Sequence, residues 1–398
     1  MISKRIETLA KKNSAIRAMF EEGIHLSKIH GKDNVFDFSL GNPIVEPPSL
    51  VKESILETIS KNDSLNIHGY MLNSGYQFVR ESVANQLNKL GNQQTFTKDN
   101  IVMTVGAAGG LNCVLQALLN PDDEVLVIAP FFVEYVNYIE NWGGKVVIAN
   151  ADHNTFTLSL ENISLKISQK TKAIILNNPN NPTGVVYSPE NIQTICDYLL
   201  LKEKEYGHPI YIISDEPYRE LAYDGTIVPF LPDYFLDTII VYSWSKSLSL
   251  PGERIGYVAI SPLCHDSKLL FDAICVCNRI IGFVNAPSLM QYVVNGCIEI
   301  APDLSLYNQN RVLLYKELTK IGFECVYPQG AFYLWVKAPC EESVFVETAK
   351  ALNLLLVGGR SFCGPGYVRI AYCVSTEQIT RSIPAFKKLW DLLIDKNK

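Results

Sequence analysis

The chain has 398 residues, of which 47% are hydrophobic and 19% charged, a balance typical of a folded globular protein. A net charge of −6 argues against a nucleic-acid binder, because neutralising phosphates requires a basic face. Ten scattered cysteines with no Cys-x-x-Cys pair form neither a disulfide framework nor a zinc motif, so we expect reduced thiols and no bound metal. Neither a signal peptide nor a membrane-length apolar run is visible, and we expect a cytoplasmic protein that binds no membrane.

The N-terminal segment favours a polar, charged helix over residues 1–34, followed by a link. Apolar residues recur at helical spacing between Ser14 and Ile24. Residues 35–43 then predict a short strand that ends in a turn, because Asn42 and Pro43 close an apolar run.

Short β-branched runs alternate with helical stretches through the middle of the chain. We expect strands at residues 101–105, 124–129, 145–148, 172–176, 210–214, 238–242 and 255–260, and helices at 111–119 and 189–204. Strands that alternate with helices, and that are apolar throughout, are typical of buried parallel strands. The sequence therefore predicts an α/β fold with a mostly parallel central sheet and helices on both faces.

The pattern changes after about residue 287. One long helical stretch is expected over residues 287–320, then strands at 332–336, 355–357 and 368–371, a helix at 343–353 and a terminal helix from about 376. This is a smaller α+β domain. We place the large domain at residues 46–288 and the small domain at residues 1–45 and 289–398.

Lys246 ends the segment 243–246, which directly follows the apolar run at residues 238–242, and Arg254 comes eight residues later. Burial favours the neutral form of a lysine, and a neutral amine forms a Schiff base with an aldehyde. The arginine, with Ser243 and Ser245, suits a phosphate. Pyridoxal 5′-phosphate (PLP) carries both an aldehyde and a phosphate. By itself, an ordinary surface lysine would explain Lys246 better.

Residues 104–110 supply a second candidate phosphate site. Gly106, Ala107 and Ala108 follow a predicted strand and open a helix, whose first N–H groups attract anions. A plain strand–helix turn explains the pattern about as well. Residues 177–184, rich in asparagine and proline, follow the strand expected at 172–176, and open α/β sheets place their ligand loops at such strand ends.

Asp215 ends another predicted strand, where a carboxylate could pair with a protonated ring nitrogen, although a helix cap is a common alternative. Tyr218 lies three residues further on. Phe132 comes just past a strand end and could stack on a flat cofactor ring, or simply pack in the core. Arg369 stands within an apolar strand and needs an anion, which is either a substrate carboxylate or a structural ion-pair partner.

Together these segments resemble the class I aminotransferases of the aspartate aminotransferase superfamily, which have PLP fold type I. The resemblance covers nearly the whole chain. Its motifs are Asn-Pro-Thr-Gly from Asn181, Asp-x-x-Tyr from Asp215, Ser-x-Ser-Lys ending at Lys246 with Arg254 eight residues later, and the late Tyr-x-Arg ending at Arg369.

The resemblance implies a role for each matching residue. Lys246 would be the Schiff-base lysine and proton carrier, and Asp215 would pair with the pyridinium nitrogen. Asn181 and Tyr218 would hydrogen-bond the phenolic oxygen of PLP, and Phe132 would stack on its ring. The phosphate would be held by Gly106, Ala107, Ala108, Ser243, Ser245, Arg254 and the partner subunit's Tyr70.

The substrate side follows in the same way. Arg369 would bind the α-carboxylate, helped by Asn181 and the backbone of Gly41, in a homodimer with shared active sites. The implied reaction moves an α-amino group between an L-amino acid and a 2-oxo acid. A PLP-dependent C–S β-lyase of the same fold is the alternative, and a PLP-sensing DNA-binding regulator is disfavoured by the acidic composition.

The chain departs from the family pattern at two places. Some aspartate-specific members carry Lys or Thr where this chain has Ala108. The uncharged Ala108 leads us to expect neutral or aromatic amino acids as substrates, with 2-oxoglutarate as the acceptor. Other members carry an arginine that acts across the dimer, just before an asparagine that matches Asn285. Arg279 is near that place but one residue out of register. Gly358 and Gly359 replace a usual Pro-Gly.

Overall fold

The computed structural model describes residues 2–11 and 15–395. The chain divides into two compact units. The large unit comprises Val45–Asn180 and Val185–Asp303, and the small unit comprises Met1–Ile44, Asn181–Gly184 and Leu304–Lys398. The functional domains expected at residues 46–288, and at 1–45 with 289–398, stay a prediction.

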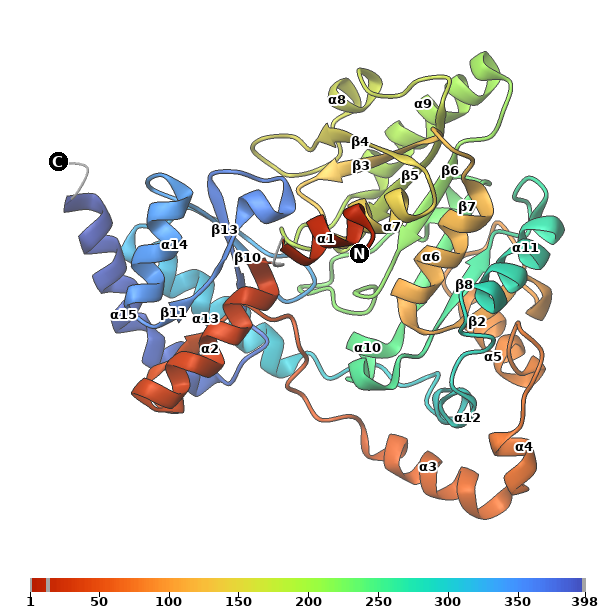
Figure 1. Cartoon of the computed structure of the whole chain (residues 1–398), viewed down its shortest axis with the longest axis horizontal. Coiled ribbons are helices and arrows are strands. Elements are labelled where there is room, and N and C mark those ends of the chain that lie inside the picture. Colours follow the sequence, from red (N-terminus) through yellow and green to blue (C-terminus); the bar gives the residue numbers. More distant parts are fainter. Residues whose placement is uncertain (1, 12–14, 396–398) are drawn as a thin grey trace. The chain divides into compact units, whose positions relative to one another are not determined.

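Within the described residues, a seven-stranded sheet forms the centre of the large unit (Figure 1). Its strands, in spatial order, are β2 (Ile101–Thr104), β8 (Gly256–Ile260), β7 (Thr238–Ser243), β6 (Tyr211–Asp215), β5 (Thr171–Asn177), β3 (Glu124–Ala129) and β4 (Lys145–Asn150). Neighbouring strands are parallel except around β8, which is antiparallel to both β2 and β7. The expected, mostly parallel sheet is confirmed.

Helices cover both faces of this sheet, because successive side chains of a strand point to opposite sides. Val241 and Val258 pack on one face with α6 (Gly106–Leu118) and α11 (Ser267–Ile280). Tyr242 and Tyr257 pack on the other face with α5 (Gln77–Leu87) and α12 (Ser288–Gly296). The remaining helices of this unit are α3 (Ser49–Lys61), α4 (Ser64–His68), α7 (Glu134–Asn141), α8 (Leu160–Ser164), α9 (Pro189–Tyr206) and α10 (Trp244–Ser247).

The small unit is built on two short sheets. One has the spatial order β12 (Val357–Gly358), β13 (Tyr367–Ala371), β10 (Tyr333–Lys337), β9 (Cys325–Val326), and all its pairings are antiparallel. In the other, β1 (Phe36–Asp37) pairs in parallel with β11 (Leu354–Leu355), which ties the N-terminal segment to the C-terminal one. The helices are α1 (Lys4–Lys11), α2 (Ala15–His30), α13 (Ser305–Ile321), α14 (Glu342–Ala351) and α15 (Thr376–Asp395).

Two sequence-based expectations about elements are wrong in detail. The single helix expected at residues 287–320 is two helices, α12 and α13. Pro302 lies in the break, where it lacks an N–H for helix bonding, and the two helices pack on different partners, α12 on α3 and α13 on α15. The strand expected at 355–357 is divided between β11 and β12. The helix expected over residues 1–34 is described as α1 and α2, and residues 12–14 between them lie outside the described part, so the single helix stays a prediction.

No helix within the described residues is long and apolar enough to cross a membrane.

Gly256, at the start of β8, provides a test of the packing between β8 and the turn that leads into α6. A Cβ atom there would lie 2.9 Å from the backbone carbon of Gly106, so backbone would have to move. We expect Gly256→Ala to lower the free energy of unfolding by about 1–3 kcal/mol. Gly252→Ala, where no described atom lies within 4 Å of the new Cβ, should change it by less than about 0.5 kcal/mol. Urea denaturation of both variants measures this, and equal effects would contradict the packing described.

Candidate functional site

The candidate residues of the large unit gather at one edge of the central sheet. Strands β2, β3, β5, β6 and β7 all run in the same direction, so their carboxyl ends share an edge. Each is followed by a segment singled out from the sequence: Gly106–Ala108, Phe132, residues 177–180, Asp215 with Tyr218, and Ser243 with Lys246. Ligands of open α/β sheets bind at this edge, because the loops there are free of strand pairing.

The turn from β2 into α6 forms a small cradle beside Arg254. Gly106 has a φ of +65°, in the left-handed region that favours glycine. A Cβ atom at Gly106 would lie 3.1 Å from the Arg254 Nη2 atom, so the guanidinium faces the first turn of α6. Ala107 and Ala108 continue that turn. Free helix N–H groups next to a guanidinium are suited to bind an oxyanion.

Ser243 and Ser245 lie at the start of α10, directly after β7. Both are buried, their hydroxyl oxygens are 2.6 Å apart, and the Ser245 N–H donates to the Ser243 Oγ over 3.1 Å. Lys246 follows in the same short helix and is half-buried. The expectation that this lysine sits just past a buried strand agrees with the geometry.

Asp215 is buried at the end of β6, and only one of its two carboxylate oxygens accepts a hydrogen bond from a described residue. The Tyr135 hydroxyl donates to its Oδ2 over 2.5 Å, and the Asn177 amide donates to its backbone carbonyl over 2.9 Å. The Oδ1 atom is buried and has no hydrogen-bond partner among the described residues. No described α-helix begins at Asp215, so the helix-cap alternative is excluded.

Burial raises the pKa of Asp215 to about 7; the hydrogen bond from Tyr135 opposes this shift, and the neighbouring Glu216 adds to it. A buried carboxyl with an open oxygen is costly unless a ligand supplies a donor or a positive charge.

Phe132 and Tyr218 lie beside this carboxyl end of the sheet. Phe132 is half-buried, and its ring meets that of Tyr135 edge-on, with centroids 5.6 Å apart. Tyr218 is buried, three residues after Asp215. Sequence reasoning missed Tyr135, which lies in α7 and reaches Asp215 across 80 positions; as an aromatic near a strand end it carried no signal that separates it from core residues.

Arg369 is the corresponding feature of the small unit. It is 2% exposed in β13, between the rings of Tyr333 and Phe362, whose centroids lie 4.4 and 4.7 Å from its guanidinium carbon. Its nitrogens donate to Asn181 Oδ1 over 3.1 Å and to the Ser39 carbonyl over 2.5 Å.

No carboxylate of the described residues pairs with Arg369, and its Nε has no hydrogen-bond partner among them. The structural ion pair considered from the sequence is therefore absent from the described part of the chain. A buried, unpaired guanidinium is an anion site, since its charge is otherwise uncompensated. The backbone of Gly41 lies against the side chain of Tyr333, whose ring covers the Arg369 guanidinium. The aromatic clamp of Tyr333 and Phe362 was not expected from the sequence.

Two further candidates lie on the surface of the large unit. Tyr70 is 94% exposed, and Leu65 beside it is 82% exposed. Arg279 is exposed in α11. Neither contributes to the edge described above within this chain.

Comparison with known proteins identifies the family of this chain. The family model of aminotransferase class I and II matches residues 33–386. A probable aspartate/prephenate aminotransferase of Aquifex aeolicus is 30% identical over 383 residues, covering 89% of this chain and 91% of the relative. An aromatic-amino-acid aminotransferase of Thermococcus litoralis is 28% identical, with 98% of each chain covered. The crystal structure of an aminotransferase from Eubacterium rectale, 42% identical, superposes with a TM-score of 0.96 over 99% of both chains.

The chain therefore belongs to the class I and II aminotransferase family, as the resemblance implied. It is a PLP-dependent aminotransferase, and its fold is PLP fold type I. The residues present fit the cofactor, because the open Asp215 Oδ1 can accept from a pyridinium N–H and the Gly106–Arg254 cradle can accept a phosphate.

The raised pKa of Asp215 predicts how stability depends on pH in the cofactor-free protein. The folded-state pKa of about 7 exceeds the unfolded value of about 3.9, so the folded state binds more protons between these values. Stability should fall as pH rises through this window and level off above it. We expect Asp215→Asn to remove this contribution, and Tyr135→Phe, which deletes the opposing hydrogen bond, to extend the fall to higher pH. Thermal unfolding across the window measures it, and identical slopes in wild type and Asp215→Asn would contradict the burial argument.

Proposed function

We propose that the carboxyl edge of the central sheet holds PLP and that Lys246 and Asp215 carry the transamination. The observation that supports this most is the buried Asp215 Oδ1 without a protein partner, at the same edge as the Gly106–Arg254 cradle. A bound PLP ring supplies an electron sink for the charge that develops at the α-carbon of the substrate.

Each residue then has a task that follows from its chemistry. Lys246 would hold the cofactor through its Nζ amine and would carry the α-proton of the substrate. Asp215 would accept a hydrogen bond from the ring nitrogen and favour its protonated form. Tyr218 and Asn181 would hydrogen-bond the phenolic oxygen, and Phe132 would pack on the ring.

The phosphate is assigned to the cradle and the buried serines. Backbone N–H groups of Gly106, Ala107 and Ala108, the hydroxyls of Ser243 and Ser245, and the guanidinium of Arg254 all belong to the large unit. Several donors on rigid elements favour a dianion, because each adds a charge-assisted hydrogen bond without reorganisation.

Arg369 is assigned to the α-carboxylate of the amino acid and of the 2-oxo acid. Its rings and two hydrogen bonds keep the guanidinium in one orientation, and it lacks an acidic partner among the described residues. Asn181 and the backbone of Gly41 complete the recognition. Every α-amino acid carries this carboxylate, so Arg369 does not discriminate between side chains.

We further propose a cytoplasmic homodimer with shared active sites. The support is a group of exposed apolar side chains near Tyr70, among them Leu65, 82% exposed, and Leu72, 69% exposed, which a second copy would bury. Tyr70 of one subunit would then reach the phosphate held by the other.

Lys246→Ala tests the central assignment. We expect it to abolish the covalent attachment of PLP and to reduce turnover by about 10²–10⁴-fold or more, because both the amine and the proton carrier are removed. Borohydride reduction followed by mass spectrometry detects the attachment, and a coupled assay gives the rate. Lys268→Ala, which alters an exposed lysine of the same unit, is the matched control. Wild-type turnover in Lys246→Ala would exclude the proposal.

Substrate preference is tested through Arg279. With Ala108 providing no charge, we expect kcat/KM for alanine, methionine and phenylalanine to lie within about tenfold of that for aspartate, with 2-oxoglutarate as acceptor. Arg279→Ala should leave these ratios unchanged. A strong aspartate preference that collapses in Arg279→Ala would instead show that Arg279 binds a distal carboxylate.

A further inference from the structure

The short helix α10 carries Lys246 and is attached to strand β7 at both of its ends. At its start, Ser243 caps the helix by accepting from the Ser245 N–H over 3.1 Å. At its end, the Ser247 Oγ lies 2.8 Å from the hydroxyl oxygen of Tyr242, and both side chains are buried. A single helical turn is not stable by itself, so its position depends on attachments of this kind.

The Tyr242–Ser247 hydrogen bond is the attachment next to the reactive side chain, because Ser247 directly follows Lys246. Two residues further on, Ser249 has a φ of +54°, in the left-handed region that residues with a side chain rarely adopt. A backbone conformation of this kind persists only where the surrounding structure holds it. The hydrogen bond therefore fixes the end of the helical turn at the point where the chain would otherwise relax.

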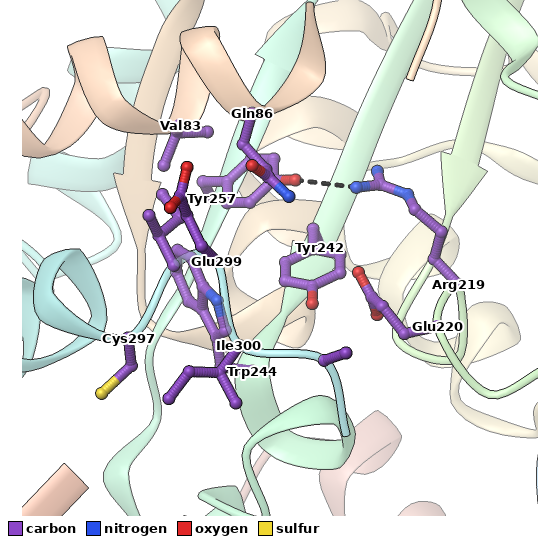
Figure 2. Close-up of a pocket in the computed structure, with 12 residues that line it drawn as sticks. Val83, Gln86, Arg219, Glu220, Tyr242, Trp244, Tyr257, Cys297, Glu299 and Ile300 are labelled. Carbon is purple, nitrogen blue, oxygen red and sulfur yellow. Dashed lines mark hydrogen bonds between the residues drawn. The ribbon is translucent and has the colours of Figure 1, made fainter. Parts of the chain in front are cut away.

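Packing surrounds the Tyr242 ring only in part. Trp244 meets it edge-on with centroids 5.4 Å apart, and Tyr257 stacks on it at 4.9 Å. All three side chains also line a cavity of about 160 Å³, where packing contacts are missing (Figure 2). Burial, together with the nearby Glu220 carboxylate, raises the pKa of Tyr242 well above its ordinary value, so the hydroxyl stays protonated and keeps its bond to Ser247.

A buried ion pair also holds the Tyr242 ring. The guanidinium carbon of Arg219 lies 4.9 Å from the ring centre, which is within the range of a cation–π contact. Arg219 pairs with the buried carboxylate of Glu216 and donates to the Tyr257 hydroxyl over 3.1 Å (Figure 2). The guanidinium is thereby fixed from several directions, and it restrains the ring on which it lies.

The same set of contacts reaches the strand that carries Asp215. Ser214 and Glu216 are the two chain neighbours of Asp215, and the Ser214 hydroxyl donates to the Glu216 carboxylate over 2.5 Å. A continuous set of buried contacts thus runs from the end of β6, through Arg219 and Tyr242, to the end of α10. All of its members belong to the large unit.

We propose that Tyr242 is a positioning residue for the transamination: through its hydrogen bond with Ser247 it holds α10 so that the Lys246 Nζ stays where proton transfer requires it. Tyr242 acts through the helix and is assigned no contact with cofactor or substrate. A misplacement of about 1 Å can lower the rate of a chemical step about 10²-fold, so a small shift of α10 is enough. This inference rests on the role given to Lys246 in the proposed function.

Tyr242→Phe and Ser247→Ala each remove one hydroxyl of the pair and keep the ring or the helix backbone. We expect kcat per bound PLP to fall about tenfold in each variant while KM for the amino acid stays within about twofold, because the amine acts in the chemical step and Arg369 in binding. The double variant should be no slower than the single variants, since all three lack the same bond.

The absorbance of the holoenzyme, titrated with pH, provides a readout besides turnover. The nitrogen that joins Lys246 to PLP gains a proton more readily when it lies close to the phenolic oxygen, so the pH midpoint of the absorbance change should fall in Tyr242→Phe and Ser247→Ala. Tyr257→Phe is the matched control. It removes a buried hydroxyl that contacts Arg219 and keeps the ring, so kcat should stay within about twofold and the midpoint should not move.

The outcomes separate this inference from the proposed function. Borohydride reduction that traps no PLP on Lys246 in the wild type would overturn both. Attachment in the wild type, with unchanged kcat and pH midpoint in Tyr242→Phe and Ser247→Ala, would overturn the positioning role alone. Equal losses in Tyr257→Phe, or losses that add up in the double variant, would also overturn it, because they would show a general loosening of the aromatic group.

Discussion

The large unit depends on one costly feature, a carboxyl group buried at the end of a central strand with only one of its oxygens satisfied. Asp215 is held from three directions: by β6 itself, by the Tyr135 hydroxyl from α7, and by the Asn177 amide from β5. Burial without a counter-charge raises its pKa and lowers stability in the absence of a ligand. Such an arrangement persists only when the surrounding structure holds it rigidly, which the parallel strands and their shared carboxyl edge provide.

The small unit shows the same principle with the opposite charge. Arg369 is buried between two aromatic rings and is hydrogen-bonded to neutral oxygens only, so its positive charge is uncompensated among the described residues. Replacing these buried charges with apolar residues would be expected to stabilise either unit. In the proposed function both charges are kept because the cofactor would compensate that of Asp215 and the substrate that of Arg369.

The sequence by itself determined the elements and residues whose signal is local. Strands buried on both faces are continuous apolar runs, so the sheet was predictable. Lys246, Asp215 and Arg369 could be singled out because each lies in such a run or shortly after it. Contacts across the sequence were not predictable. Tyr135 reaches Asp215 over 80 positions, and Tyr333 and Phe362 lie on either side of Arg369. The division of residues 287–320 into α12 and α13 was not predictable either. The helical periodicity of the sequence continues through these residues, whereas the two helices pack on different partners. These contacts and this division follow from the tertiary structure, because which side chains meet depends on how distant elements pack. Helical or strand periodicity indicates which face of an element is buried but does not identify the residues that it contacts.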